Sequence, residues 1–321
     1  MEAKTCERGR ILYLAIPCYN EEEVLPETAQ RLLGKMEDLM EKNRISKESR
    51  ILFINDGSKD RTWELIEELH EKNPIFQGIR LSRNKGHQNA LLGGLMTAKE
   101  YADMVISMDA DLQDDIDVID QFVEKYYEGC EIVYGVRSAR KTDTFFKRFT
   151  AESFYRMINF MGGEVVFNHA DCRLMSKRAL DELENYREVN LFLRGIVPMI
   201  GFQTASVTYE RQERFAGESK YPLKKMVGLA VDGITSLSIK PIRFIVFLGG
   251  LLFLCSILML IYSLVQHYLG NTISGWTSLI VSIWAIGGLQ LFAIGIIGEY
   301  IGKIYLETKA RPKYIIEKVL R

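Results

Sequence analysis

Residues 104–113 read MVISMDADLQ, an apolar run followed at once by an acidic turn. The run at 104–108 has the length of a buried strand and stops at polar residues. Three similar runs lie at 11–16, 51–54 and 131–136, and segments with helical spacing fall around 22–42, 61–72, 88–101 and 116–128. Strands that alternate with helices predict βαβ units, and hence an α/β fold with a doubly wound, mostly parallel sheet.

Acidic side chains follow the 104–108 run directly. Asp109, Asp111 and Gln113 occupy alternate positions, so in an extended segment they would point to one side. Ligands of doubly wound sheets bind beyond the carboxyl ends of the strands. Two carboxylates there, without a cationic neighbour in sequence, are hard oxygen ligands of the kind that hold Mg²⁺ or Mn²⁺ beside substrate phosphates. A solvated acidic loop is the alternative for such a pair taken alone.

The two earlier strands also end in polar residues. The first runs into IPCYNEEE at 16–23, and the second runs into NDGSKD at 55–60. An acidic residue beyond such a strand can accept hydrogen bonds from a ribose hydroxyl or a base edge, which we expect of Asp56. Asp60 is better suited to capping the next helix.

A membrane anchor is predicted in the C-terminal part. Residues 244–298 contain no Asp, Glu, Lys or Arg, and two apolar spans within them, about 244–266 and 277–298, are each long enough to cross a bilayer. Lys and Arg lie before the first span and after the second, but not in the link at 267–276. This bias predicts that both termini are cytoplasmic. A buried hairpin of a soluble protein is the alternative.

The chain is therefore predicted to have four regions. They are a cytoplasmic domain at 1–221, an amphipathic juxtamembrane segment at 222–243, a two-helix membrane hairpin at 244–298, and a basic cytoplasmic tail at 299–321. The juxtamembrane segment suits the membrane interface, and a surface helix packed on the domain is its alternative. The 41 Lys and Arg residues nearly balance the 42 Asp and Glu residues, so the composition gives no indication of nucleic-acid binding. The N-terminus shows no signal-peptide pattern, which agrees with a cytoplasmic domain.

Several motifs resemble one known family. PCYNEEE at 17–23, NDGSKD at 55–60 and DADLQ at 109–113, in this order, resemble the family 2 glycosyltransferases with the GT-A fold. Further matching stretches are RNKGHQNA at 83–90, ADCRLM at 170–175, FLRG at 192–195 and RQERFAGESKY at 211–221. With two C-terminal spans, the chain is similar over essentially its whole length to polyprenyl-phosphate glycosyltransferases, closest to bactoprenol glucosyltransferases and related to dolichol-phosphate mannose synthases. One departure is the acidic DDID at 114–117, where many relatives have a proline-containing stretch. A helix is expected to begin there, and its dipole favours negative charge.

The resemblance implies where the donor and the metal bind. For the nucleotide-sugar it points to Pro17, Tyr19, Asn20, Glu21, Asp56, Lys85, Gln88 and Asp109. It also implies that Asp109, Asp111 and Gln113 hold Mg²⁺ or Mn²⁺ with the diphosphate. The metal would neutralise the leaving group, which makes Asp111 a catalytic residue on this reading.

The acceptor side is expected around Asp171, the residue predicted to lie nearest the reacting centre. A phosphate monoester is already largely dianionic near neutral pH, so Asp171 is expected to orient the acceptor or take a residual proton rather than act as an obligatory base. A structural salt bridge to Arg173 or another arginine is the alternative. The acceptor phosphate is expected to bind Arg137, Arg148, Arg211, Arg214, Ser219 and Lys220, although each charge taken singly also suits a solvated surface. His87, which no nucleophile motif accompanies, is expected to be a positioning residue in a loop.

The resemblance implies an inverting, metal-dependent transfer of a hexose to undecaprenyl phosphate or another polyprenyl phosphate, giving a lipid-linked sugar for glycosylation of the cell envelope. Glucose from UDP-glucose is the first choice of donor, and UDP-N-acetylhexosamine and GDP-mannose are alternatives. Relatives of this kind also form homo-oligomers through their membrane helices. A processive polysaccharide synthase would carry a QxxRW motif, which the chain lacks, and a transporter would carry charges within its spans. A non-catalytic nucleotide-binding membrane scaffold is the alternative from another class.

Overall fold

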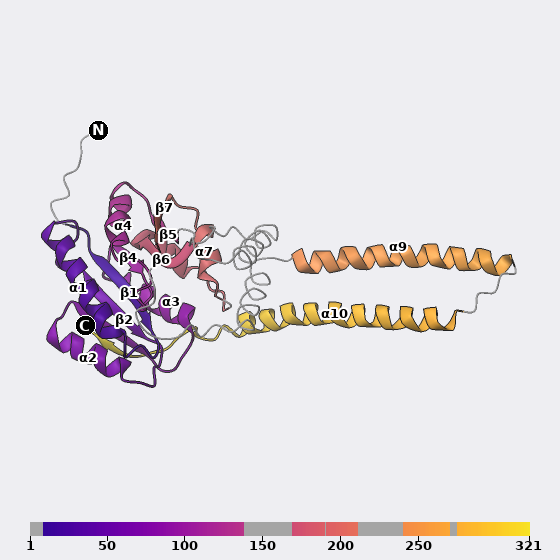
Figure 1. Ribbon diagram of the computed structural model, residues 1–321, viewed down its shortest axis with the longest axis horizontal. Helices are drawn as coiled ribbons and strands as arrows, with labels where there is room; N and C mark the ends of the chain where they lie inside the picture. Colours follow the sequence, from indigo (N-terminus) through magenta and orange to yellow (C-terminus); the bar gives the residue numbers. More distant parts are fainter. Residues whose placement is uncertain (1–8, 138–168, 190, 211–239, 270–274) are drawn as a thin grey trace.

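The computed structural model describes residues 9–137, 169–189, 191–210, 240–269 and 275–321. An α/β domain lies at one end, and two long helices extend side by side from it (Figure 1). The domain is built on one eight-stranded sheet with the order β7-β5-β6-β4-β1-β2-β3-β8. The strands are β1 (Leu12–Cys18), β2 (Arg50–Asn55), β3 (Phe76–Leu81), β4 (Met104–Ser107), β5 (Ile132–Arg137), β6 (His169–Ser176), β7 (Thr204–Tyr209) and β8 (Ile316–Leu320).

The sheet is mixed and mostly parallel. β1 pairs in parallel with β2 and β4, β2 pairs in parallel with β3, and β5 pairs in parallel with β7. β6 runs antiparallel between β4 and β5, and β8 runs antiparallel to β3 at the edge. The predicted α/β fold with a mostly parallel sheet is thus confirmed.

Helices cover both faces of the sheet. One layer contains α1 (Leu25–Glu41), α2 (Thr62–Lys72) and α4 (Val118–Tyr127), and the other contains α3 (His87–Ala98), α6 (Lys177–Glu184) and α7 (Leu193–Met199). β1 serves both layers because successive strand side chains point to opposite faces. Its residues Leu12, Leu14 and Ile16 join the first buried cluster, and Tyr13 and Ala15 join the second.

The four predicted strands and four predicted helices are confirmed to within a few residues, whereas four strands were not predicted. β3 reads FQGIRL, in which polar residues and a glycine interrupt the apolar run. Packing explains the glycine at position 78, because a Cβ there would lie 2.6 Å from the side chain of Ile66 on α2. The glycine therefore lets α2 approach β3 closely, at the expense of the pattern that marks a strand.

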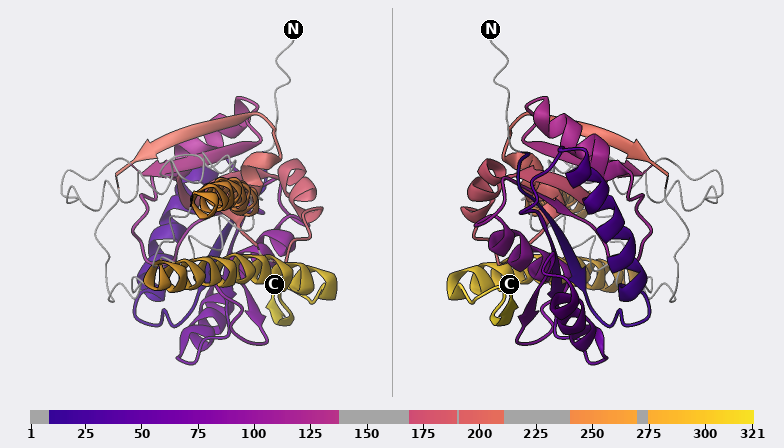
Figure 2. Two further views of the ribbon diagram at one scale, coloured as in Figure 1. Left: turned by 90° about the vertical axis from the view of Figure 1, so that its right-hand side faces the viewer. Right: turned by 90° about the vertical axis from the view of Figure 1, so that its left-hand side faces the viewer.

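The two long helices, α9 (Lys240–Tyr268) and α10 (Trp276–Lys309), occupy the region of the predicted spans (Figures 1 and 2). Among the described residues, one helical stretch is long and apolar enough to cross a membrane, Ala285–Lys309. α9 contributes a shorter apolar stretch, Ile242–Leu252. One span is therefore supported, and the second stays a prediction. Most of the predicted juxtamembrane segment lies outside the described residues.

The C-terminal residues, predicted as a basic tail, return to the domain and complete its sheet. α10 ends at Ala310, which has a φ of 44° and so turns the chain out of the helix. β8 then pairs with β3, with Val319 opposite Ile79. The chain that leaves the C-terminal end of α10 is thus joined to the sheet by the backbone hydrogen bonds between β8 and β3.

Candidate active site

Polar side chains gather at the edge of the sheet where β4 ends. β6 runs antiparallel to β4 with Ser107 opposite Arg173. The same register, continued by two residues, brings Asp109 beside Asp171, although 62 residues separate them in sequence. Both lie beyond the carboxyl end of β4, where ligands of such sheets bind.

His87 joins these two carboxylates at the start of α3. Its Nε2 lies 3.7 Å from Asp109 Oδ1 and 3.8 Å from Asp171 Oδ2. One ligand atom from each of the three residues lies within 4.8 Å of the others, so the group is compact enough for one metal ion. Gly86, which precedes the helix, has a φ of 85°, a conformation that favours glycine and directs the chain into α3.

Asp171 is held by two arginines. Arg194 on α7 donates from Nε to Oδ1 (3.0 Å) and from Nη2 to Oδ2 (2.9 Å), and the buried Arg173 donates from Nη2 to Oδ1 (3.2 Å). Burial alone would raise the pKa of Asp171, but the charge and hydrogen bonds of Arg194, then Arg173 and His87, hold that pKa well below its usual range. Asp171 is therefore a stable carboxylate and a weak base, and its position is fixed at both oxygens.

Asp109 has the opposite character. Burial, with the nearby carboxylates Asp171, Asp114 and Asp111, raises its pKa to about 6, and the nearby His87 acts in the lowering direction. The side chain is 28% exposed, so a ligand can reach it. A partly accessible carboxylate that is costly to ionise is one that a divalent cation would stabilise. The carboxylate of Asp109 with the imidazole of His87 beside it therefore fits a divalent metal, whereas both oxygens of Asp171 already accept hydrogen bonds from arginines.

The turn after Asp109 differs from the extended segment assumed in the sequence analysis. β4 ends at Ser107, and Leu112 has a φ of 56°, so side chains at 109, 111 and 113 do not simply alternate. Asp111 Oδ1 accepts the backbone N–H of Gln113 (3.2 Å), and the side chain of Gln113 is buried. Among the described residues, Asp111 is not part of the compact group formed by His87, Asp109 and Asp171.

The loops on the donor side are tied together by predicted site residues. The buried Asp56 accepts the backbone N–H groups of Lys85 (2.7 Å) and Gly86 (2.9 Å) with its two oxygens. Gly57 has a φ of 64°, and a Cβ there would lie 2.6 Å from backbone atoms of Arg83 and Asn84. Asp56 and Gly57 thus fix the loop that leads to His87.

Asn20 joins the first strand's loop to the second. Its backbone N–H donates to Ser58 Oγ (3.0 Å), and its Oδ1 accepts the N–H of Lys59 (2.9 Å). Asp60 was predicted to cap α2, but the N-cap residue is Arg61; Asp60 lies one position earlier, and its Oδ1 accepts the N–H of Thr62. Of the other predicted donor residues, Pro17 lies within β1, Tyr19 is exposed, and the backbone N–H of Glu21 donates to Thr62 Oγ1 (2.9 Å).

Comparison with known sequences identifies the chain at this point. Residues 13–184 match the family described as Glycosyl transferase family 2. The chain belongs to this glycosyltransferase family. It is 59% identical to the uncharacterized glycosyltransferase YkoT of Bacillus subtilis (strain 168), over 96% of this chain and 91% of that one. It is 42% identical to the bactoprenol glucosyl transferase of Shigella phage SfII, over 95% of this chain and 97% of that one.

A solved structure, the mannosyl-3-phosphoglycerate synthase of Rubrobacter xylanophilus, is similar over 70% of this chain and 71% of its own. The two share 14% sequence identity with a TM-score of 0.48. The assignment to the family rests on the sequence comparisons.

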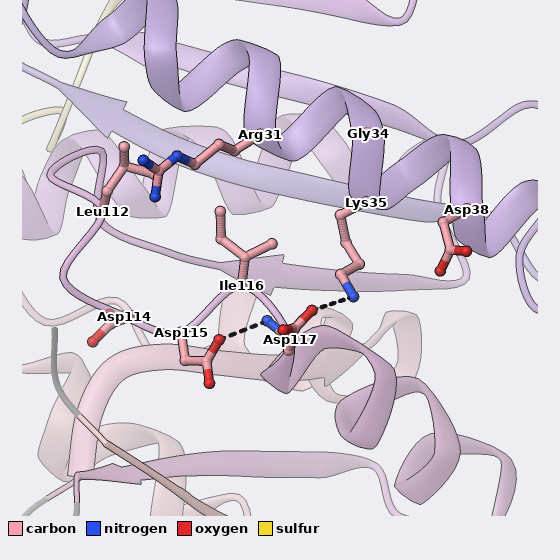
Figure 3. Close-up of a pocket in the computed structure, with 9 residues that line it drawn as sticks. All are labelled: Arg31, Gly34, Lys35, Asp38, Leu112, Asp114, Asp115, Ile116 and Asp117. Carbon is pink, nitrogen blue, oxygen red and sulfur yellow. Dashed lines mark hydrogen bonds and ion pairs between the residues drawn. The ribbon is translucent and has the colours of Figure 1, made fainter.

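The acidic residues of DDID at 114–117, where many relatives have a proline-containing stretch, contact neighbouring groups of the protein. Figure 3 shows a cavity of about 390 Å³ between α1 and the turn that precedes α4. Lys35 of α1 forms an ion pair with Asp117, and Asp115 Oδ1 accepts the N–H of Asp117 (3.0 Å). Asp114 accepts a hydrogen bond from the hydroxyl of Tyr209 (2.6 Å). Each of the three extra carboxylates therefore has a partner in or beside the turn that precedes α4.

Gln88 was predicted to bind the nucleotide-sugar, but in the structure its side chain contacts the backbone of α7. Its Oε1 accepts the backbone N–H of Leu193 (2.9 Å), so it ties α3 to the start of α7. The amine of Lys85 lies 3.4 Å from the backbone oxygen of Pro312. Both residues flank His87 and help to fix its loop.

Three residues of this site, Arg173, Arg194 and His87, have larger parts than the sequence indicated. The salt bridge of Asp171 to Arg173 or another arginine, given above only as the alternative, is present with both Arg173 and Arg194. His87 was expected only to position a loop, yet it lies between the two carboxylates. Of the predicted acceptor-phosphate residues, Arg137 ends β5, whereas Arg148, Arg211, Arg214, Ser219 and Lys220 lie outside the described residues.

Proposed function

We propose that this glycosyltransferase transfers glucose from UDP-glucose to undecaprenyl phosphate, with inversion at the anomeric carbon. The observation that carries the proposal is the convergence of Asp109, His87 and the arginine-bound Asp171 beyond the carboxyl end of β4. The names of relatives at 40–42% identity, bactoprenol glucosyl transferases, support both the sugar and the polyprenyl acceptor. UDP-N-acetylhexosamine and GDP-mannose are the alternative donors.

Mg²⁺ or Mn²⁺ would be held by Asp109, with Asp111 and Gln113 from the same turn and with His87 close by. When bound, the metal supplies positive charge that stabilises the departing nucleoside diphosphate. Carboxylate oxygens are suitable ligands for either ion. Pro17, Tyr19, Asn20, Glu21, Asp56, Lys85 and Gln88 would line or shape the donor side.

Asp171 orients the acceptor phosphate and does not act as the base that removes a proton from it. Its two oxygens accept hydrogen bonds from Arg194, and its depressed pKa makes it a poor base. The acceptor phosphate has a second pKa of about 6, so near neutral pH it is already largely ionised and needs no strong base. The guanidinium groups of Arg194 and Arg173, together with the predicted cations ahead of the spans, provide a positive environment for that phosphate.

The membrane location follows from the acceptor. A polyprenyl phosphate remains in the bilayer, and a domain held beside the membrane avoids a search for an insoluble acceptor in bulk water. The apolar stretch in α10 supports one span, and we propose a second in α9, with the domain and both termini on the cytoplasmic side. Homo-oligomers formed through these helices are part of the same proposal.

The test is a transfer assay with the full chain in detergent. Mg²⁺, undecaprenyl phosphate and a panel of labelled nucleotide-sugars are supplied, and label in the lipid phase is counted. We expect transfer from UDP-glucose, a loss of about 100-fold or more in Asp111→Asn, and near wild-type transfer in Asp115→Asn, which changes a neighbouring carboxylate outside the site. Transfer from another donor alone would replace glucose by that sugar. Nucleotide binding by a folded protein that transfers nothing would favour the scaffold.

A further inference from the structure

Glu307, near the end of α10, contacts the catalytic domain. Both carboxylate oxygens of Glu307 accept the backbone N–H of Val189, at 2.7 and 2.8 Å. Both residues are half-buried, and 118 positions separate them in sequence. A charge-assisted hydrogen bond of this kind is among the stronger ones, so the contact is more than an incidental approach of two surfaces.

Val189 lies shortly before the segment that holds Asp171. Four residues later, the N–H of Leu193 donates to Gln88, and the carbonyl of Leu193 accepts from the buried Arg173 (3.4 Å). The next residue, Arg194, makes the two-pronged contact with Asp171. Gln88, Arg173 and Asp171 thus contact the start of α7, and Glu307 of α10 contacts Val189, four residues before it.

The residues that follow Glu307 reach the same region and the donor loop. Lys313 Nζ donates to the backbone oxygen of Tyr186 (3.0 Å), and Lys85 Nζ lies 3.4 Å from the carbonyl of Pro312. The N–H of Ser82 donates to the carbonyl of Ile315 (3.0 Å). One short stretch after α10 therefore touches both the loop that leads to His87 and the chain just before Val189.

We propose that Glu307 is a positioning residue for sugar transfer, which holds Val189 close to the start of α7 so that Arg194 keeps Asp171 in place. This inference rests on the proposed function. α10 has 34 residues, which is about 51 Å of helix against about 30 Å of bilayer core. The helix therefore extends well beyond the bilayer as a stiff rod. Its contact at Glu307 sets where Arg194 and Asp171 lie relative to the membrane that contains the acceptor.

The test uses the full chain in detergent or nanodiscs, with Glu307→Ala, Glu307→Gln and the matched control Glu299→Gln. Glu299 is an exposed glutamate two turns earlier on the same helix. Hydrogen–deuterium exchange is measured on peptides covering 186–196, and initial rates of transfer are measured against UDP-glucose. In Glu307→Ala we expect the Val189 amide to exchange about tenfold faster, because a bond to a charged acceptor has been removed.

Measuring kcat and KM distinguishes a loss of positioning from a general loss of folded protein. In Glu307→Ala, kcat is expected to fall about tenfold while KM for UDP-glucose stays within about twofold, because Glu307 contacts the acceptor side. Glu307→Gln keeps an acceptor oxygen and is expected to recover a good part of kcat, and Glu299→Gln should behave as wild type. Unchanged exchange at Val189 in Glu307→Ala, or faster exchange with unchanged kcat, would overturn the inference. A wild-type chain that transfers no sugar would instead refute the proposed function, and the exchange experiment would still decide whether Glu307 holds this segment.

Discussion

Replacing Asp109 with asparagine is expected to stabilise the protein at alkaline pH while abolishing transfer. The carboxyl has a pKa of about 6 in the folded protein, against an ordinary value of 3.8. At pH 8 the Asp109 carboxyl is ionised in both the folded and the unfolded protein. Its charge is less favourable in the folded protein, where the carboxyl is removed from water. The difference of about 2.2 pH units corresponds to about 3 kcal/mol, which asparagine, a neutral group of the same shape, would remove.

The sign of the pH dependence follows from the raised pKa. The folded state binds a proton more readily than the unfolded state, so Asp109 contributes relative stability that is present below pH 3.8 and is lost as the pH rises through about 6. The advantage of Asp109→Asn is therefore largest at pH 8. At pH 5 it should shrink to about half, because the wild-type carboxyl is by then mostly protonated in the folded state.

Thermal unfolding of the full chain in detergent, without metal or nucleotide, checks this. A gain of about 3 kcal/mol in a domain of this size corresponds to roughly 6–12 °C in Tm. Asp38→Asn is the control, since the hydrogen bond from Lys42 lowers the pKa of the exposed Asp38 and no gain in Tm is expected. An unchanged or lower Tm for Asp109→Asn at pH 8 would refute the reasoning that burial strains this carboxylate.

Two further predictions concern the site and its loops. Arg194→Lys keeps the positive charge but loses the two-pronged contact with Asp171. The rate of sugar transfer should therefore fall at least about tenfold, with little change in the affinity for UDP. An equal loss of transfer rate and UDP affinity would contradict this role of Arg194. Gly57→Ala should lower the Tm by several degrees, because φ is 64° and a Cβ would meet the backbone of Arg83. Gly34→Ala, at a helical position with open space around it, should leave the Tm unchanged or raise it slightly, and a Tm equal to wild type in Gly57→Ala would argue against the close approach.

The fold was largely predictable because its central elements carry strong periodic signals. β1, β2 and β4 are continuous apolar runs, since parallel strands are buried on both faces. β3 and β8 were missed because their sequences, FQGIRL and IEKVL, mix polar and apolar residues. β8 is an edge strand with one neighbour, and its exposed side chains have no need of an apolar pattern.

From spacing alone, the site was predictable only where its residues are close in sequence, and Asp171 was expected near the reacting centre from the family resemblance. Asp109 could be placed at a strand end from the 104–113 stretch alone. Asp171 lies beside Asp109 because β6 pairs antiparallel with β4, and no local sequence pattern indicates that pairing. Arg194 reaches the site through α7, and its contact with Asp171 depends on tertiary packing that neither spacing nor composition encodes.

The edge position of β8 has a consequence for the order in which the protein is made. The ribosome releases the chain from its N-terminus, so β3 emerges long before the strand that pairs with it. Both long helices, α9 and α10, must be synthesised before Ile316–Leu320 exists. Until then β3 presents an unpaired edge, which is open to association with other chains. Residues 316–320 therefore complete the edge of the sheet only after α9 and α10 have been synthesised, so association through the β3 edge is possible until that point.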